Sequence, residues 1–331
     1  MKTLIIAEAG VNHNGDLNTA LILCKAAKDS GADVVKFQTW ITENIITKSV
    51  KKADYQQENT KNNDSQFDML KKLELSQEDF RKIKAYCDEI GITFASTADD
   101  KESLDFLVDL GIPFIKIGSG EIGNVSYLRY MGSKNKPIIL STGMSTLEDI
   151  DLSIKALKEG GAKDITILHC TTNYPCPFDS VNLNAIDTLK QRYELPVGYS
   201  DHTKGIEVAI AAVAKGATVI EKHFTLDCKA EGPDHLASTE PEEFKKMVNS
   251  IRNIEKALGN GEKLPTSDEV NISKVVLKRI VAIKEIKKGE VIKEDMIACK
   301  RSENGEPARN WDLVVGSVSN KDYSIDEGIV L

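Results

Sequence analysis

Residues 196–225 read PVGYSDHTKGIEVAIAAVAKGATVIEKHFT, and the pattern in this stretch decides the fold. Two apolar runs of strand length, 196–201 and 219–225, flank a segment of helical period at 206–215, which Gly216 follows. Continuous apolar runs are typical of strands covered on both faces, as in a parallel sheet with helices outside it. A glycine after a helix suits the left-handed conformation of a C-cap. The stretch therefore predicts a strand, a helix and a second, parallel strand.

The same alternation extends through most of the chain. Six more apolar runs of strand length precede the quoted stretch, at 4–9, 34–39, 93–97, 114–119, 137–142 and 165–170. Segments of helical period lie between them, at 17–30, 76–90 and 147–159, and end near Gly31, Gly91 and Gly160. Eight such repeats predict the α/β class and, within it, a (β/α)8 TIM barrel. A doubly wound open sheet shares this alternation and stays open as the alternative.

The composition changes after a helix predicted at 242–258. The segment GNGEKLPTSDE has the glycine, proline and charge of a linker, and short β-branched stretches follow it. We predict a barrel domain over 1–260, a linker over 261–273 and a small β-rich module over 274–331. Within the barrel domain, the polar connection over 40–75 is unusually long, and long loops after barrel strands are typically lids or binding loops.

Charge and hydropathy exclude several classes of protein. The formal net charge is −8 and no basic run is sustained, which argues against a nucleic-acid partner. Because no apolar run reaches the length of a membrane span or of a signal peptide, we expect neither. The six cysteines lack paired metal-ligand spacing and are expected to be reduced thiols. Together these features predict a cytoplasmic protein.

Polar side chains interrupt six of the eight predicted strands at their carboxyl ends. Barrel enzymes carry their chemistry at that end. Lys36 and Lys116 offer the donors that a phosphate and a carboxylate require. Hydroxyls that could assist them belong to Thr97, Ser119 and Ser200. Since an unpaired buried lysine is costly, two interpretations stay open: a site for an anionic ligand, or structural ion pairs with Glu8 or Glu121.

Two histidines follow neighbouring strands. His202 comes directly after the seventh predicted strand and His223 lies within the eighth, so both imidazoles are expected at one side of the barrel mouth. Neutral imidazoles are good ligands for a first-row divalent ion. With only two protein nitrogens, water or substrate would fill the other positions, which favours a Lewis acid over a structural zinc.

The motifs at the strand ends, in order, resemble the sialic acid synthase family over essentially the full chain. They are AEAGVNHNGD, VVKFQT, KIGSGE, ILSTGM, HCTTNYP, GYSDHT, EKHFT and GPDHLAS. The segment IKKGEVIKEDMIACKR similarly looks like the antifreeze-like (SAF) domain of these synthases. The resemblance implies a TIM barrel that condenses phosphoenolpyruvate with an N-acetylated mannosamine-type aldose to give a nonulosonic (sialic) acid and phosphate.

The resemblance also implies roles for individual positions. His202 and His223 match the metal ligands, with Mn²⁺ expected and Mg²⁺ or Co²⁺ as alternatives. Positions that hold phosphoenolpyruvate are matched by Lys36, Thr97, Lys116, Ser119 and Ser200. Positions around the sugar and the reacting water are matched by Glu8, Gln38, Glu121, Tyr174 and Asp234. Arg301 matches an arginine that reaches the partner subunit's active site and contacts the N-acetyl group, which implies a domain-swapped homodimer.

In the implied reaction, C3 of phosphoenolpyruvate attacks the aldehyde, water adds at C2, and phosphate leaves by C–O cleavage. Lys36, Lys116 and the metal would stabilise developing charge, and Glu8 would position or deprotonate the water. The product expected first is N-acetylneuraminate, with N,N'-diacetyllegionaminate or pseudaminate as alternatives. The stretch 55–66 resembles the bacterial neuraminate and legionaminate branches.

Two readings from other classes remain. A Schiff-base aldolase would use Lys116 or Lys36 as its nucleophile and need no metal. A non-catalytic sugar-binding barrel would bind without turnover. Two departures from the family are also visible. Many relatives have STPFD after the third strand, whereas this chain has Ser96-Thr97-Ala98-Asp99-Asp100, so the loop beside Thr97 is expected to differ. The family's KRPGNG or KRPGSG is replaced here by KRSENG at 300–305.

Overall fold

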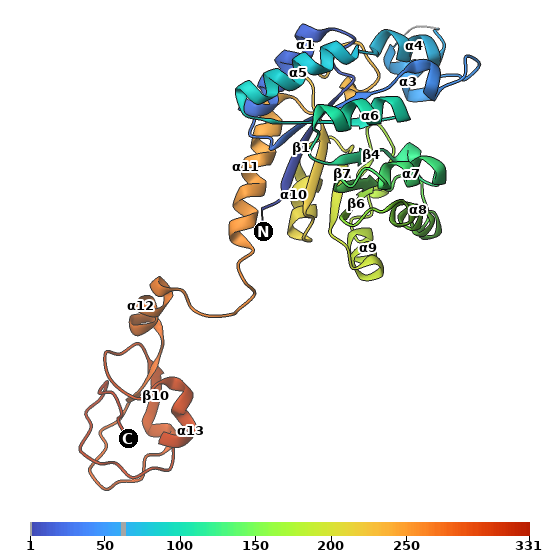
Figure 1. Cartoon of the computed structure of the whole chain (residues 1–331). Helices are drawn as coiled ribbons and strands as arrows, with labels where there is room; N and C mark the ends of the chain where they lie inside the picture. Colours follow the sequence, from blue (N-terminus) through green and yellow to red (C-terminus); the bar gives the residue numbers. More distant parts are fainter. Residues whose placement is uncertain (1, 61–63) are drawn as a thin grey trace. The chain divides into compact units, whose positions relative to one another are not determined.

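The structure, a computed structural model, describes residues 2–60 and 64–331. Eight parallel strands close into a barrel in chain order, with β1 beside β8 (Figure 1). They are β1 (Leu4–Gly10), β2 (Val34–Thr39), β3 (Thr93–Ala98), β4 (Ile115–Ile117), β5 (Ile138–Ser141), β6 (Ile165–Cys170), β7 (Val197–Asp201) and β8 (Val219–His223). Every strand lies within or within one residue of a predicted run, so the TIM barrel is confirmed and the open sheet is excluded.

Helices follow the strands and surround the barrel (Figure 1). They are α1 (Leu17–Asp29), α5 (Gln77–Ile90), α6 (Lys101–Leu110), α7 (Val125–Gly132), α8 (Leu147–Gly160), α9 (Ala185–Tyr193), α10 (Glu207–Ala214) and α11 (Pro241–Ala257). Ser76 and Thr146 begin α5 and α8 with capping boxes. Gly91 ends α5 in the left-handed conformation, as predicted, whereas the left-handed cap of α8 is Gly161 and not Gly160.

The strand side chains divide between two faces. One set forms an apolar cluster of its own in the barrel interior: Leu4, Ile6, Val34, Ala95, Phe114, Ile139, Leu168 and Val219. Their strand neighbours, such as Ile5, Val35 and Phe94, join the helices in the main core. Because side chains alternate along a strand, residues two positions further along also point inwards. These are Glu8, Lys36, Thr97, Lys116, Ser141 and Glu221. An apolar plug thus closes the barrel beneath a polar layer.

The connection predicted as a long polar loop over 40–75 is largely helical. It contains α2 (Thr42–Ile45), α3 (Asp54–Thr60) and α4 (Gln66–Leu73). Met69 and Leu73 pack with Trp40 and Val11 in a small buried cluster. The connection is long, as predicted, but the sequence did not reveal these helices, which a few well-spaced apolar side chains anchor; residues 61–63 lie outside the described part. Whether the segment acts as a lid stays a prediction.

The C-terminal unit spans Asn260–Leu331 and is compact by itself. It begins with α12 (Ser267–Val276), so part of the linker predicted over 261–273 is helical. Strands β9 (Arg279–Ala282) and β10 (Ile297–Lys300) pair antiparallel, and α13 spans Trp311–Val314. Its own core includes Ile280, Ile297, Val314, Tyr323 and Ile329.

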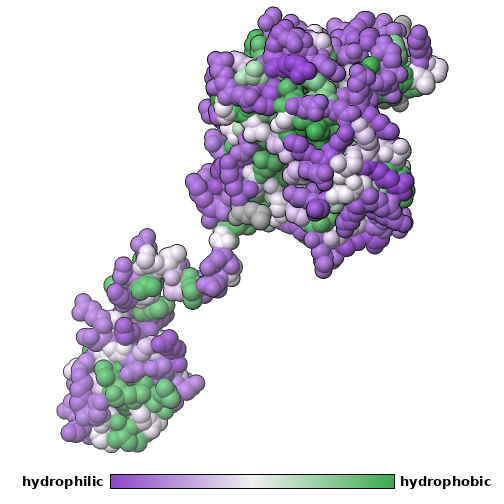
Figure 2. All heavy atoms as spheres, viewed as in Figure 1, coloured by the Kyte–Doolittle hydropathy of each residue, from purple (hydrophilic) through white to green (hydrophobic). Residues whose placement is uncertain are grey.

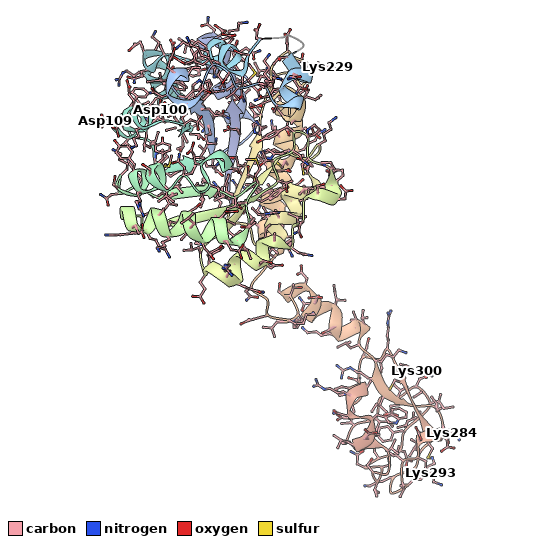
Figure 3. All side chains as sticks on the ribbon, turned by 90° about the vertical axis from the view of Figure 1, so that its right-hand side faces the viewer. Asp100, Asp109, Lys229, Lys284, Lys293 and Lys300 are labelled. Atoms are coloured by element: carbon pink, nitrogen blue, oxygen red, sulfur yellow. The ribbon has the colours of Figure 1, made fainter. Side chains whose placement is uncertain are left out.

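Apolar side chains reach the surface of the C-terminal unit. Hydrophilic side chains dominate the visible face of the barrel unit, and the C-terminal unit displays an apolar patch among hydrophilic side chains (Figure 2). Leu313, Val318 and Ile325 are at least 60% exposed there. Lys284 and Lys300 also lie on this unit (Figure 3), where they pair with Asp295 and Asp326. In the described residues, no helix combines the length and the apolar character needed to cross a membrane.

Candidate active site

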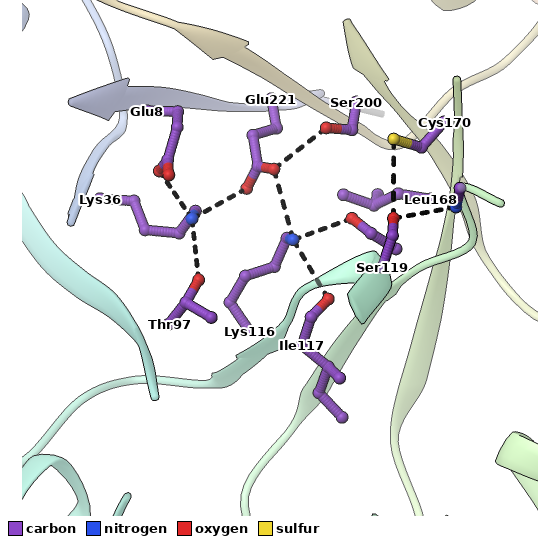
Figure 4. Close-up of polar contacts among 12 residues, drawn as sticks. Glu8, Lys36, Thr97, Lys116, Ile117, Ser119, Leu168, Cys170, Ser200 and Glu221 are labelled. Carbon is purple, nitrogen blue, oxygen red and sulfur yellow. Dashed lines mark hydrogen bonds and ion pairs between the residues drawn. The ribbon is translucent and has the colours of Figure 1, made fainter. Parts of the chain in front are cut away.

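Two lysines and two glutamates form a continuous chain of ion pairs inside the barrel (Figure 4). Lys36 Nζ lies 2.6 Å from Glu8 Oε2 and 3.7 Å from Glu221 Oε2, and Lys116 Nζ lies 3.3 Å from Glu221 Oε1. Strand pairing explains this, because β1 places Glu8 opposite Lys36 and barrel closure brings β8 alongside β1. Of the two carboxylates considered as partners for the lysines, Glu8 does pair with Lys36, whereas Lys116 pairs with Glu221 and not with Glu121.

Hydroxyl groups surround both ammonium groups (Figure 4). Lys36 Nζ donates to Thr97 Oγ1 at 2.9 Å, and Lys116 Nζ donates to Ser141 Oγ at 2.8 Å. Ser200 Oγ donates to Glu221 Oε1 at 3.1 Å. The layer therefore holds donors of both the charged and the neutral kind, the set that a phosphate and a carboxylate on one small ligand require.

A close backbone approach shapes one wall of this layer. The amide of Gly143 donates to Ser119 Oγ at 2.9 Å. A Cβ on Gly143 would lie 2.1 Å from Thr172 Oγ1 and 2.8 Å from Ser119 Oγ, so a side chain at this position requires its neighbours to move. Glycine is therefore required here for the space it leaves.

The environments of the two glutamates move their pKa values in opposite directions. Burial raises the pKa of Glu8 despite the opposing charge of Lys36. Burial acts the same way on Glu221, but Lys116 and Lys36 together hold its pKa at about 2. Two carboxyls whose environments move their pKa values apart are a typical arrangement of an acid–base site. Glu221 is therefore a fixed anion, whereas Glu8 is the more basic of the two carboxylates.

These groups line a cavity of about 180 Å³ at the carboxyl ends of the strands. Of the thirteen residues that the sequence predicted for the site, ten line it: Glu8, Lys36, Gln38, Thr97, Lys116, Ser119, Tyr174, Ser200, His202 and His223. Glu121 lies beside it in a short 3-10 helix, Ser119–Glu121. Asp234 Oδ2 lies 3.8 Å from His223 Nδ1. Arg301 belongs to the C-terminal unit, and its predicted role stays a prediction.

The two histidines converge as predicted. Their ring centroids are 5.4 Å apart, and Tyr174 packs against both rings, at 4.3 Å from His202 and 5.6 Å from His223. His202 Nδ1 donates to the carbonyl of Thr171 at 2.7 Å, so Nε2 is the ring nitrogen that remains for a ligand. Burial and the neighbouring His202 keep the pKa of His223 well below its usual value, so this imidazole is neutral.

The histidine pair fits a divalent ion as a partial ligand set. His223 Nδ1 is buried and has no hydrogen-bond partner among the described residues, so a polar atom faces the site with its lone pair unused. In the described ranges, no group of three or more His, Cys, Asp or Glu side chains is arranged to hold a metal. Two imidazoles therefore suit an ion whose remaining positions are taken by substrate or water.

Several residues that line the cavity were not among the predicted ones. Glu221 and Ser141 contact the lysines, and Cys170 Sγ lies 3.8 Å from Ser119 Oγ and 3.9 Å from His202 Nδ1. Asp99 lines the cavity, and burial together with the charge of Glu121 raises its pKa to about 7. The signal for the first three was available, since each lies two positions beyond an interior apolar residue of its strand.

Comparisons with known proteins follow the same division of the chain. The NeuB family pattern matches residues 23–263, and the SAF domain pattern matches residues 279–330. The sequence is 49% identical over 328 residues to N,N'-diacetyllegionaminic acid synthase of Campylobacter jejuni, covering 98% of each chain. It is 46% identical to the enzyme of that name from Legionella pneumophila, over 96% of this chain and 91% of the relative.

More distant relatives make other products. Human N-acetylneuraminate-9-phosphate synthase is 34% identical over 94% of this chain and 87% of the relative. Among solved structures, N-acetylneuraminic acid synthetase from Leptospira borgpetersenii superposes with a TM-score of 0.72 at 34% identity, over 83% of this chain and 93% of that one. Higher identity to the two legionaminic acid synthases favours the legionaminate alternative over the N-acetylneuraminate product expected first.

Proposed function

Because this chain belongs to the NeuB family and carries a SAF domain, we propose that it condenses phosphoenolpyruvate with a diacetylated 6-deoxy mannose-type aldose to give N,N'-diacetyllegionaminate and phosphate. The family consists of nonulosonic acid synthases, so the chain is an enzyme of the transferase type that forms a C–C bond. The choice of acceptor is supported by the 49% and 46% identity to two N,N'-diacetyllegionaminic acid synthases.

The observation that carries the proposal is the buried pair of lysines, Lys36 and Lys116, beneath a cavity lined by hydroxyls. Phosphoenolpyruvate has a phosphate and a carboxylate on one small carbon skeleton. The two ammonium groups bind one anionic group each, and Thr97, Ser119 and Ser200 supply neutral donors. Glu221 offsets part of the positive charge and orients both lysines through its two carboxylate oxygens.

The residues of the site then account for the bond changes. The C2–C3 π electrons of phosphoenolpyruvate form the new bond to the aldehyde carbon, whose oxygen takes up a proton. Water adds at C2 and loses one proton; the bond from C2 to the bridging oxygen then breaks, and the remaining proton of the C2 hydroxyl passes to the departing phosphate, which leaves a 2-keto acid and inorganic phosphate. Glu8 accepts the proton of the water, since its raised pKa makes it the more basic carboxylate. Lys36 and Lys116 stabilise the charge that develops.

His202 and His223 would hold the divalent ion, for which Mn²⁺ is proposed with Mg²⁺ or Co²⁺ as alternatives. When bound there, the ion supplies a Lewis acid that polarises the aldehyde of the acceptor. The chain's own contribution is orientation: the carbonyl of Thr171 fixes the tautomer of His202, and Tyr174 packs against both rings. Bonds to the other ring nitrogen of a metal ligand typically set the direction of the ligand's lone pair.

The Schiff-base alternative is disfavoured by the charge on Lys36. A lysine that attacks a carbonyl must lose its proton readily, and such lysines usually have a depressed pKa. Burial lowers the pKa of Lys36, but Glu221 and Glu8 more than compensate and raise it. Borohydride treatment in the presence of pyruvate is expected to leave no adduct on Lys36 or Lys116, as judged by peptide mass.

The acceptor is tested by comparing kcat/KM for three aldoses with phosphoenolpyruvate and Mn²⁺: the diacetylated 6-deoxy sugar, N-acetylmannosamine and its 6-phosphate. We expect the diacetylated sugar to be preferred by at least about tenfold, equivalent to about 1.4 kcal/mol. A preference for N-acetylmannosamine would instead assign the N-acetylneuraminate product. Turnover without any aldose would contradict both.

A further inference from the structure

One ion pair of the barrel lies on the opposite face of the strands from the site. Lys222 Nζ lies 2.7 Å from Asp201 Oδ2, and both side chains are 0% exposed. Their strand neighbours Ser200 and Glu221 line the cavity, so Asp201 and Lys222 point away from it, between the sheet and the helices. Residues on that face, such as Ile220, are otherwise mostly apolar and belong to the main core. Burying two charges there requires a compensating arrangement.

The compensation comes from the residue that follows His202. Asp201 Oδ1 accepts from the amide of Thr203 at 2.9 Å and from its hydroxyl at 2.8 Å. Lys222 Nζ donates to the carbonyl of Thr203 at 2.7 Å. The residues on both sides of His202, Asp201 and Thr203, are thus bonded to each other and to Lys222, which directly precedes His223.

Strand pairing places this link at the level of the histidines. Asp201 is the register partner of Lys222 across β7 and β8, and each directly precedes one of the two histidines. A slip or tilt of one strand would move one imidazole relative to the other, whose centroid is 5.4 Å away. The bond from His202 to Thr171 orients one ring but does not connect the two strands.

We propose that Asp201 and Lys222 are positioning residues that hold His202 and His223 at the separation needed to share one divalent ion. This inference rests on the proposed function, which assigns the ion to that pair. It differs from a purely structural role in one respect: loss of the pair weakens metal binding even when the fold keeps its stability.

The test is the double variant Asp201→Asn/Lys222→Met. Asparagine keeps an acceptor for Thr203, and methionine fills the volume of the lysine stem, so no unpaired charge is left buried. The matched control is Asp33→Asn/Arg252→Met, which removes an ion pair with an N···O distance of 2.5 Å. Asp33 directly precedes β2, so this pair lies at the end of the barrel opposite the site. Binding of Mn²⁺ alone is measured by the paramagnetic resonance of the free ion, and thermal unfolding is followed in parallel.

We expect the Kd for Mn²⁺ to rise at least about tenfold in the Asp201/Lys222 variant, which is typical when residues that orient a metal ligand are lost. In the control the Kd should stay within about twofold of the wild-type value. An unchanged Kd in a folded Asp201/Lys222 variant overturns the proposal. Equal weakening in both variants also overturns it, because that result would reflect general loosening of the barrel.

Two further measurements cover the remaining outcomes. If the double variant does not fold, Thr203→Val, which removes only the hydroxyl bond to Asp201, is expected to raise the Kd about threefold, and no change overturns the proposal. If the wild-type chain binds no Mn²⁺, the metal of the proposed function is wrong. The positioning role is then tested by the ¹⁵N imidazole signals of His202 and His223 in the metal-free wild type, the Asp201/Lys222 variant and the control. Signals that shift in the Asp201/Lys222 variant but not in the control support the role, and signals that shift in neither refute it.

Discussion

Glu8 and Glu221 both pair with Lys36, yet their carboxyl pKa values move in opposite directions. Both are buried, and burial alone raises the pKa of each. Glu221 contacts Lys116 as well, and this second charge outweighs burial, whereas the single lysine beside Glu8 does not. Glu221 is thus a permanent counter-ion of the lysines, and Glu8 is the more basic carboxylate of the site.

Removal of the second lysine tests the anion site. In Lys116→Met, Glu221 keeps Lys36 as its partner, so we expect a folded protein. Loss of one buried charged donor to phosphoenolpyruvate should lower kcat/KM for this substrate at least about 100-fold, or about 3 kcal/mol. Steady-state kinetics at saturating acceptor measure it, with Lys155→Met on the exposed face of α8 as the control. A fall of less than threefold would place phosphoenolpyruvate elsewhere.

The close approach at Gly143 makes a second prediction. Gly143→Ala brings a Cβ to 2.1 Å from Thr172 Oγ1, so the wall of the cavity must shift. We expect a loss of about 1–3 kcal/mol of unfolding free energy and a raised KM for phosphoenolpyruvate. Adding Thr172→Ala removes the obstructing hydroxyl and should restore most of the stability. If the double variant is no more stable than Gly143→Ala alone, the steric explanation is wrong.

Asp99 predicts a pH dependence of stability. Burial and then the charge of Glu121 raise its pKa from 3.8 to about 7 in the folded chain. Between these values the folded chain binds a proton that the unfolded chain has lost, so the free energy of unfolding falls as pH rises through this window. Asp99→Asn cannot ionise and should be more stable than wild type by about 1–3 kcal/mol above the window. The melting temperatures should converge at about pH 4; a constant difference across pH would contradict the assignment.

A shared active site is the prediction that depends on Arg301. If each C-terminal unit completes the site of a partner subunit, mixing Arg301→Ala chains with His223→Ala chains creates some sites that have both residues. We expect partial recovery of synthase activity after mixed refolding, measured as 2-keto acid formed, and none from either variant alone. Mixed dimers that stay inactive would count against sharing of sites between subunits.

The fold could be predicted because the signals for it are local. Runs such as 137–142 and 165–170 are apolar without alternation, and this alone indicates strands covered on both faces. Lys36 and Lys116 could be assigned to one rim because each interrupts such a run at its carboxyl end. Helix α4 escaped prediction because its buried face rests on Met69 and Leu73 within a polar segment.

The pairing inside the site could not be predicted, because it depends on barrel closure. Glu8 and Glu121 were the carboxylates considered as partners for the lysines, but the closed barrel brings Glu221 to Lys116 across the interior. The Asp201–Lys222 pair was hidden for the same reason, since only the register of β7 and β8 places the two side chains together. The sequence indicates whether a strand side chain points into the barrel or towards the helices. Which side chain it contacts depends on the register between neighbouring strands and on closure of the barrel.

The central claim is that the buried lysine layer presents phosphoenolpyruvate to an acetylated aldose, with cleavage of its C–O bond. The most direct measurement uses phosphoenolpyruvate labelled with ¹⁸O in the bridging position, together with Mn²⁺ and the diacetylated aldose, and follows the label by mass. We predict that phosphate appears only when the aldose is present, that it equals the 2-keto acid formed, and that it carries the label. Release of unlabelled phosphate, or release without an aldose, would contradict the account.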